Sequence, residues 1–241
     1  NSADRIVITA VVGVAANGIF AIAYKIPSLM ATVSGIFNQA WSYSAIREDE
    51  SDDKESYTNQ IYNGFFMVIS LAALGILKPF MKIYVSDVYY SAWKYAPYLI
   101  IGFVFQTLSS FLSTPYTVNK DSKGFLFSAT FGAAINIILN FLLVFRYGTT
   151  GVAIATCASY MAVFFYRVWD TKKYIRMDVF NKRYVLIMGI LVLQAVIVYF
   201  ENIVASILLV FLFTVGVILQ YKTWYPFVVQ IKDKVMSRIK K

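Results

Sequence analysis

The chain has 241 residues, of which 59% are hydrophobic and only 15% are charged, whereas a soluble domain usually has about a quarter of its residues charged. It contains no histidine and a single cysteine, Cys157, which excludes a disulfide framework, a zinc cluster and histidine-based acid/base chemistry. Backbone groups in lipid must be satisfied within the spanning segment. We therefore expect an all-α polytopic membrane bundle, without a metal or cofactor.

Apolar runs alternate with charged or turn-rich breaks and predict a partial span followed by seven full spans. The partial span covers 1–13, and the full spans lie near 18–46, 59–77, 98–114, 125–145, 151–168, 184–199 and 203–221. This predicts one transmembrane bundle over 1–221, and a basic amphipathic tail over 222–241 that suits a helix on an anionic leaflet. The chain begins at Asn1 without a signal-like segment, so we expect a fragment of a longer protein.

The basic residues lie mostly in loops, and their distribution orients the chain. Most of them fall in the loops 47–58, 115–124, 167–183 and 222–241, whereas the opposite loops hold four, Lys78, Lys82, Lys94 and Arg146. The positive-inside rule then places the first set and the C-terminus in the cytoplasm. The net charge of +9 is explained by this topology, without nucleic acid as a partner.

The first two spans carry the polar residues that are most informative about function. "GVAANG" at 13–18 lacks the Lys and Ser/Thr of a phosphate loop, so Gly13 and Gly18 predict a tight turn between the spans. Steps of three and four place one polar stripe on the second span, made of Lys25, Ser28, Thr32, Gly35 and Gln39. Pro27 can kink that helix. The stripe either lines a hydrated path, or Lys25 extends to the outer interface.

Ionisable groups in a membrane normally face a partner or a wet cavity. Asp4 and Arg5 in the partial span fit this description, although they also suit the polar end of a helix. Their side chains point about 100° apart, so they need not pair with each other. Asp4 is the candidate for ion coupling. Later spans repeat polar edges, which we interpret as helix packing and hydrogen-bonding sites, while several such edges also suit a transporter cavity. They are Gln106, Ser109, Ser110 and Ser113; Gly132, Asn136 and Asn140; and Gly151, Ala155 and Ser159.

Several segments resemble a known family. "NSADRIVI", "GIFAIAYKIPSLM", "FNQAWSYSAI" and "YGTTGVAIAT" are similar to the C-terminal half of Wzx-type polysaccharide flippases of the multidrug/oligosaccharidyl-lipid/polysaccharide exporter superfamily. The resemblance implies the second lobe of a two-lobe exporter in a bacterial inner membrane. It also implies movement of undecaprenyl-pyrophosphate-linked oligosaccharide from the inner to the outer leaflet by alternating access, for polysaccharide biosynthesis. A polysaccharide polymerase and chain-length machinery would be partners, together with membrane lipid.

The resemblance gives the polar residues a role in substrate binding. A pyrophosphate is a concentrated anion that an ammonium or a guanidinium can bind, so Lys25 and Arg5 are its candidate ligands. Asn38 and Gln39 can hydrogen-bond sugar hydroxyls, and the indole of Trp41 can stack on a sugar face. These five residues form the candidate substrate site.

Two other functions fit parts of the sequence. An organic-cation antiporter of the same superfamily would expose acidic residues to its cavity, and Asp4 is the clear acidic residue in the spans. A membrane polysaccharide polymerase would need a sizeable hydrophilic loop, whereas the longest loops have about 20 residues. No catalytic set can be assembled, so we expect a transporter and not an enzyme.

Overall fold

The computed structural model describes residues 2–47, 52–174, 182–221 and 225, with the side chains of 40–61 outside the description, and within these ranges the chain forms helices and no strands. It divides into two compact units. The first comprises Asn1–Glu50 and Ile76–Met177, and the second comprises Ser51–Gly75 and Asp178–Lys241. The tail predicted over 222–241 lies outside the described residues, apart from Tyr225.

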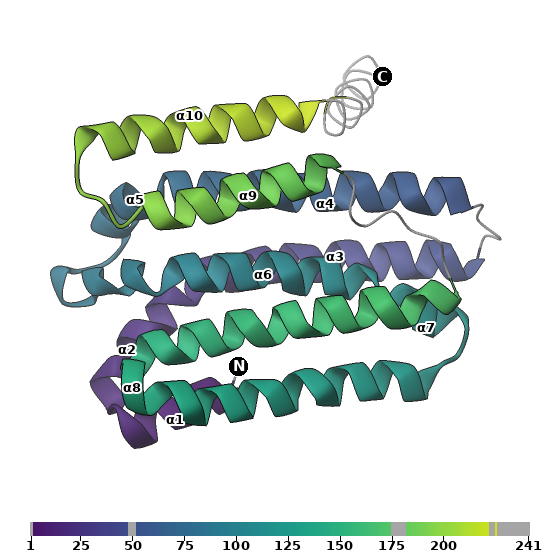
Figure 1. The fold of residues 1–241 in the computed structure, drawn as a ribbon, viewed down its shortest axis with the longest axis horizontal. Coiled ribbons are helices and arrows are strands. Elements are labelled where there is room, and N and C mark those ends of the chain that lie inside the picture. Colours follow the sequence, from purple (N-terminus) through teal and green to yellow (C-terminus); the bar gives the residue numbers. More distant parts are fainter. Residues whose placement is uncertain (1, 48–51, 175–181, 222–224, 226–241) are drawn as a thin grey trace, which may run out of the picture. The chain divides into compact units, whose positions relative to one another are not determined.

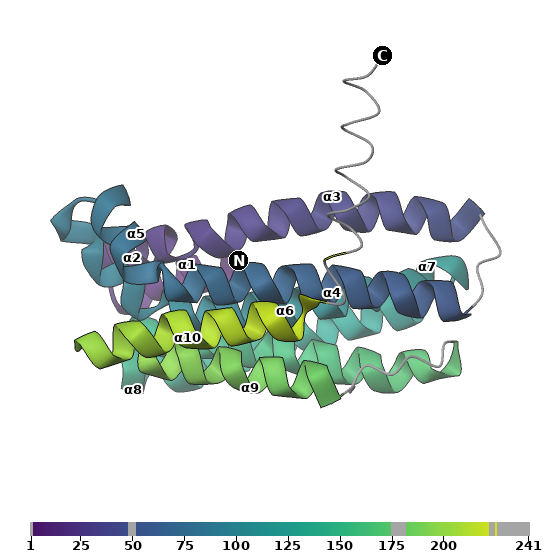
Figure 2. The ribbon, with the colours of Figure 1, turned by 90° about the horizontal axis from the view of Figure 1, so that it is seen from above.

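The first unit carries most of the helices. They are α1 (Ser2–Val11), α2 (Val14–Ala23), α3 (Lys25–Arg47), α5 (Leu77–Tyr84), the 3-10 helix η1 (Asp87–Lys94), α6 (Ala96–Phe111), α7 (Thr114–Val118), α8 (Ser122–Asp170) and the 3-10 helix η2 (Thr171–Lys173) (Figure 1). Within this unit α2 and α5 lie at one end, and α7 lies at the other (Figure 2). α6 packs along α8, and α1 packs against both α2 and α8.

The second unit consists of α4 (Asp52–Gly75), α9 (Lys182–Ile197) and α10 (Ile203–Leu219), each in contact with the other two. Gln194 is fully buried, and its amide donates a hydrogen bond to the carbonyl of Leu209 at 3.0 Å. A Cβ at Gly216 would collide with the side chain of Leu71. Gly216 therefore lies where α10 packs closely against α4.

The second predicted span is a bent pair of helices. α2 and α3 meet at Tyr24 with an angle of 47° between them. Pro27 has no N–H for the carbonyl of Ala23, and its ring clashes with the carbonyl four residues earlier. The helix breaks at Ala23 and Tyr24, where Pro27 is expected to disturb the helical hydrogen bonds. The predicted kink is therefore confirmed.

The turn between the first two spans lies at Gly13. Its φ of 119° belongs to a region that glycine adopts readily and other residues do not. The prediction for Gly18 was wrong, because α2 begins at Val14 and includes it. A Cβ at Gly18 would lie 3.6 Å from the ring of Tyr89, so this glycine instead lies where α2 packs against η1.

The spans predicted over 125–145 and 151–168 are the two antiparallel halves of α8. The helix breaks at Gly148, where φ is 55° and ψ is −136°. Pairing across the halves shows the direction: a Cβ at Gly132 would meet Val163, a Cβ at Gly151 would meet Leu143, and Ser128 accepts a hydrogen bond from Arg167. α8 is therefore a helical hairpin (Figure 1).

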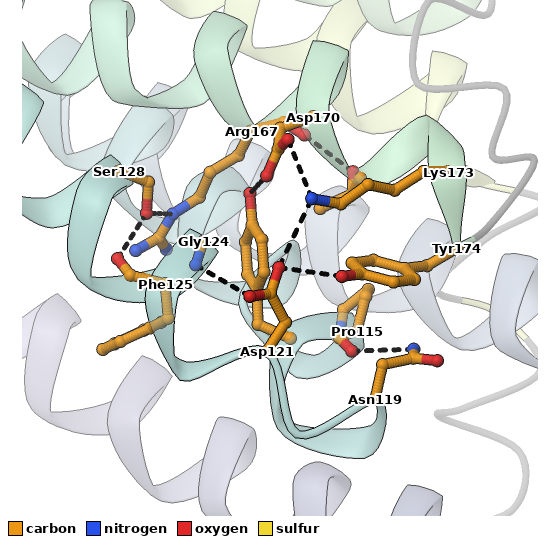
Figure 3. A network of polar contacts seen from close by, with 12 residues as sticks. Pro115, Asn119, Asp121, Gly124, Phe125, Ser128, Arg167, Asp170, Lys173 and Tyr174 are labelled. Atoms are coloured by element: carbon orange, nitrogen blue, oxygen red, sulfur yellow. Dashed lines mark hydrogen bonds and ion pairs between the residues drawn. The ribbon is translucent and has the colours of Figure 1, made fainter.

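A polar network ties the open end of this hairpin together (Figure 3). Asp121 caps α8 by accepting from the Gly124 N–H at 2.9 Å and from the Tyr174 hydroxyl at 2.8 Å. Lys173 bridges Asp121 at 3.3 Å and Asp170 at 3.0 Å, and the Tyr116 hydroxyl donates to Asp170 at 2.7 Å. The described parts of the predicted loops 115–124 and 167–183 therefore meet at one end of the unit.

Arg167 departs from the sequence prediction, which placed it in a cytoplasmic loop. It lies within α8, is only 7% exposed, and donates to Ser128 Oγ at 3.0 Å and to the Ser109 carbonyl at 2.7 Å. Its guanidinium also stands over the ring of Phe125. The predicted span 151–168 includes Arg167, but the charge count assigned this residue to the loop 167–183 because it is basic. The structure places its donors against acceptors inside the bundle.

Two helices in the described part of the chain are individually long and apolar enough to cross a membrane, Ala96–Val118 and Ser122–Lys173. The number becomes four if each bent pair is counted as one span, and the apolar helix Ile203–Leu219 is shorter. Because Ser122–Lys173 contains the two halves of the α8 hairpin, it corresponds to two of the predicted spans. The all-α membrane bundle is thus confirmed.

The network at the open end of the hairpin predicts a pH-dependent contribution to stability. The Gly124 N–H, followed by the Tyr174 hydroxyl, lowers the pKa of Asp121 below its ordinary value. This stabilisation is present above the unfolded-state pKa of about 4 and is lost as pH falls through the lower folded-state pKa. Asp121→Asn should lower the melting temperature at pH 7, and the difference from wild type should vanish once the pH falls below the lowered folded-state pKa of Asp121.

Thermal unfolding in detergent at a series of pH values measures this effect. Asp87→Asn is the control at pH 7, because Asp87 is an exposed carboxylate without a hydrogen bond to a described residue. It should leave the melting temperature unchanged. An Asp121→Asn protein as stable as wild type at pH 7 would show that the network does not hold the hairpin.

Candidate functional site

A concave site opens between α1, α2 and the start of α3. It has a volume of about 430 Å³, and its lining residues are Ser2, Arg5, Phe20, Ala21, Tyr24, Lys25 and Ser28. The turn at Gly13 brings α2 back against α1, and the break at Tyr24 begins α3 with Lys25. Two predicted ligands, Arg5 and Lys25, therefore line one site although they are 20 positions apart in the sequence.

Within the predicted polar stripe, the hydroxyls of Ser28 and Thr32 and the ammonium of Lys25 have different roles. The Ser28 hydroxyl donates to the Lys25 carbonyl at 2.8 Å, and the Thr32 hydroxyl donates to the Ser28 carbonyl at 3.0 Å. These bonds satisfy the hydroxyls within α3. Lys25 is exposed, and no carboxylate in the described part of the chain forms an ion pair with it. Its ammonium is therefore available to an anion.

The remaining predicted substrate residues lie further along α3. Asn38 is half-buried and Gln39 is exposed, but neither lines the site that holds Arg5 and Lys25. Trp41 belongs to α3, and its side chain lies outside the described residues. The grouping of Arg5 with Lys25 is thus a property of the structure, while the role of the other three stays a prediction.

Asp4 faces a different side of α1 from Arg5 and is fully buried, with 0% exposure. Its Oδ1 accepts from the Asn140 amide at 2.8 Å, and its Oδ2 accepts from the Thr156 hydroxyl at 2.9 Å. Asn140 belongs to one half of the α8 hairpin and Thr156 to the other. The carboxylate therefore joins α1 to both halves of α8, and its separation from Arg5 agrees with the angle expected on a helix.

The surroundings of Asp4 are rich in oxygen and lack a positive charge. No basic side chain in the described part of the chain forms an ion pair with Asp4. Asn140 also donates to the Asn136 Oδ1 at 3.2 Å, and the Asn140 Oδ1 has no hydrogen-bond partner among the described residues. A buried carboxylate without a countercharge is costly. A proton or a small monovalent cation would remove that cost, and carboxylate, amide and hydroxyl oxygens suit a hard cation.

Thr156 can serve Asp4 in either state. Its hydroxyl lies 2.9 Å from Asp4 Oδ2 and 3.0 Å from the Val152 carbonyl oxygen, but a hydroxyl has one proton to donate. An ionised Asp4 accepts a hydrogen bond from the Thr156 hydroxyl. A protonated Asp4 can instead donate to Thr156, which then donates to Val152.

Sequence reasoning found part of this second site. Asn136 and Asn140 were singled out as a polar edge with an expected role in helix packing and hydrogen bonding. Asn140 donates to Asp4 on α1 and to Asn136 on its own helix, so of the two it is Asn140 that bonds to a neighbouring helix. Thr156 was missed. Its position could have indicated it, because Thr156 directly follows Ala155 of the small-residue ridge. A hydroxyl beside such a ridge is buried when the ridge packs closely against another helix.

The fold and these two sites define an α-helical membrane protein with buried and cavity-lining charges, and sequence comparison agrees with that class. A segment of 142 residues is 32% identical to a probable lipid II flippase, MurJ, of Thermotoga maritima, covering 54% of this chain and 30% of that protein. A second segment of 87 residues is 28% identical to an uncharacterized membrane protein of Methanocaldococcus jannaschii, covering 36% of this chain and 17% of that protein.

The chain thus spans less than a third of the length of either relative. No protein-family model and no solved structure matches the chain. The comparisons support a distant relationship to a lipid II flippase and to a membrane protein, without pointing to the Wzx type in particular.

The hydrogen bond from Thr156 to Asp4 predicts a loss of stability when the hydroxyl is removed. Thr156→Val keeps the shape of the side chain but leaves Asp4 Oδ2 without its donor, and an unsatisfied buried polar group costs about 1–3 kcal/mol. The melting temperature in detergent should fall. Thr214→Val is the control, because the exposed Thr214 hydroxyl donates only to its own helix, to Val210. Equal melting temperatures for the two variants would contradict a specific role for the Asp4 site.

Proposed function

We propose that this chain forms part of a membrane flippase that moves a lipid-linked oligosaccharide from the inner to the outer leaflet by alternating access. The substrate would be an undecaprenyl-pyrophosphate-linked oligosaccharide of polysaccharide biosynthesis. The protein would lie in a bacterial inner membrane with its C-terminus in the cytoplasm. The similarity to a protein named as a lipid II flippase supports a transporter in preference to an enzyme.

The observation that carries the proposal is the pair of cations in one site. Arg5 and Lys25 line the same concave site, and none of the described residues that line it is acidic. A guanidinium and an ammonium together suit a pyrophosphate, because charge-assisted hydrogen bonds to phosphate oxygens are strong. The prenyl chain can remain in lipid while its head group occupies the site. Asn38, Gln39 and Trp41 would lie near the path of the glycan, and a polymerase with chain-length machinery would be the partners.

Asp4 would provide the coupling to an ion gradient. Alternating access needs an energy source when transport is directional, and the buried carboxylate lies beside oxygen atoms of Asn140 and Thr156. Binding and release of a proton or a sodium ion at Asp4 would change the attraction between α1 and the two halves of α8. The ion would therefore act on the same helix that carries Arg5.

The alternative of an organic-cation antiporter is less well supported. Such a transporter needs an acidic group facing its cargo, but Asp4 is buried against α8 and is not among the residues that line the concave site. That arrangement suits a small ion better than an organic cation.

The cation pair predicts a specific pattern of transport defects. In proteoliposomes that contain the full-length protein, Lys25→Gln and Arg5→Gln should each reduce translocation of a fluorescent undecaprenyl-pyrophosphate oligosaccharide about tenfold or more, as expected for a lost charged hydrogen bond of about 1.5–3 kcal/mol. Lys25→Glu should abolish transport through repulsion, whereas Lys25→Arg should retain most of it.

An organic-cation dye in the same vesicles provides the comparison. Movement of the dye without the lipid-linked sugar would overturn the proposal in favour of the antiporter. Export that is unaffected by Lys25→Gln and also by Lys25→Glu would show that Lys25 does not bind the substrate.

The role of Asp4 leads to a separate expectation about the driving force. Asp4→Asn should uncouple transport from the gradient, so that the sugar equilibrates but no longer accumulates in the outer leaflet. The measurement compares an imposed sodium gradient with an imposed pH gradient, and the gradient that drives wild type identifies the ion. If the variant responds to the gradient as wild type does, Asp4 is not the coupling residue.

A further inference from the structure

Arg5, Thr9 and Asn17 form a closed ring of hydrogen bonds between α1 and α2. The Arg5 Nε donates to Asn17 Oδ1 at 3.2 Å, the Asn17 Nδ2 donates to Thr9 Oγ1 at 2.8 Å, and the Thr9 hydroxyl donates to the Arg5 carbonyl at 2.7 Å. The ring begins and ends on Arg5, on its backbone at one end and on its side chain at the other. It therefore fixes the guanidinium relative to its own helix.

The donors and acceptors available on Arg5, Thr9 and Asn17 determine the direction of each hydrogen bond in the ring. Thr9 is one turn after Arg5 on α1, and its single proton goes to the Arg5 carbonyl, which can only accept. The Thr9 oxygen must then accept from Asn17, so the amide nitrogen of Asn17 faces Thr9. The amide oxygen consequently faces Arg5, whose Nε can only donate. Every bond in the ring has one possible direction.

The ring leaves the other end of the guanidinium unused. Arg5 makes no further hydrogen bond or ion pair within the described part of the chain, so its two terminal NH₂ groups have open donors. Arg5 lines the concave site that contains Lys25, and it also lines an adjoining one of about 540 Å³ with Thr9 and Asn17. Asn17, which lines the second site, therefore holds the guanidinium that also lines the first.

We propose that Asn17 and Thr9 are positioning residues that hold the Arg5 guanidinium so that its two terminal NH₂ groups bind one phosphoryl group of a diphosphate end-on. Lys25 then faces the other phosphoryl group. The planar fork of arginine matches two phosphate oxygens, and a fork held in advance loses less conformational entropy on binding. This inference rests on the proposed function, since it assumes that Arg5 and Lys25 bind an anion.

Binding of inorganic pyrophosphate to the purified full-length protein, measured by titration calorimetry, tests the proposal. Asn17→Leu, similar in size to the wild-type residue, should weaken binding about 3- to 10-fold, the range of one ordinary hydrogen bond. Thr9→Val should weaken it similarly, because Asn17 then lacks its orienting acceptor. Thr9→Ser keeps the hydroxyl and should bind as wild type does. Thr9 is exposed and Asn17 is half-buried, so the melting temperature should not change in these three variants.

The decisive control is the Arg5→Lys background. Lysine has no Nε donor of the arginine kind, so Asn17→Leu should have no additional effect on pyrophosphate affinity there. The Thr9→Val and Asn17→Leu double variant should be no weaker than either single variant, because both act through one ring. A purely structural role for Asn17 would instead lower affinity equally in both backgrounds.

The outcomes separate this inference from the proposed function. If Arg5→Gln weakens pyrophosphate binding but Asn17→Leu does not, or weakens it equally in the Arg5→Lys background, the positioning role is wrong and the anion site stands. If Arg5→Gln has no effect on binding, the anion site is wrong and the positioning role fails with it.

Discussion

The burial of Asp4 is the constraint on which the arrangement of the first unit depends. Its two carboxylate oxygens accept from Asn140 and Thr156, which lie on the two halves of the α8 hairpin. One short side chain therefore fixes α1 against both halves at once. Since neighbouring residues on a helix point about 100° apart, turning Asp4 toward α8 turns Arg5 toward α2. The hydrogen bonds of Asp4 to α8 thus determine the direction in which the Arg5 guanidinium points.

Helix α1 therefore separates a buried carboxylate, Asp4, from the pair of cations Arg5 and Lys25. On one side, oxygen atoms gather around a buried carboxylate without a basic partner among the described residues. On the other, Arg5 and Lys25 line a site whose described lining residues include no acidic one. If the opposite charges shared one cavity, they would pair with each other and bind neither a cation nor an anion well. A rigid helix between them keeps both available, and it allows occupancy on one side to influence the other mechanically.

Two breaks in helical geometry determine where the residues of both sites lie. Gly148 reverses the chain so that Asn140 and Thr156 can face the same carboxylate. The break that Pro27 imposes at Tyr24 starts a new helix axis at Lys25. The Tyr24 hydroxyl also lies 3.3 Å from the Tyr160 hydroxyl, one turn after Thr156 on α8. The bend in the second span and the buried carboxylate are therefore connected through the same half of the hairpin.

The sequence by itself determined the features that depend on local pattern. Hydropathy and the 3.6-residue period predicted the helical membrane bundle, the turn at Gly13, the kink near Pro27 and the polar stripe that begins at Lys25. Tertiary structure alone decided which distant groups meet. Asp4 finds its partners 136 and 152 residues away, and Arg167 is satisfied in the bundle and not in a loop. Periodicity fixes a direction around one helix axis, but the partner in that direction is fixed only when helices pack.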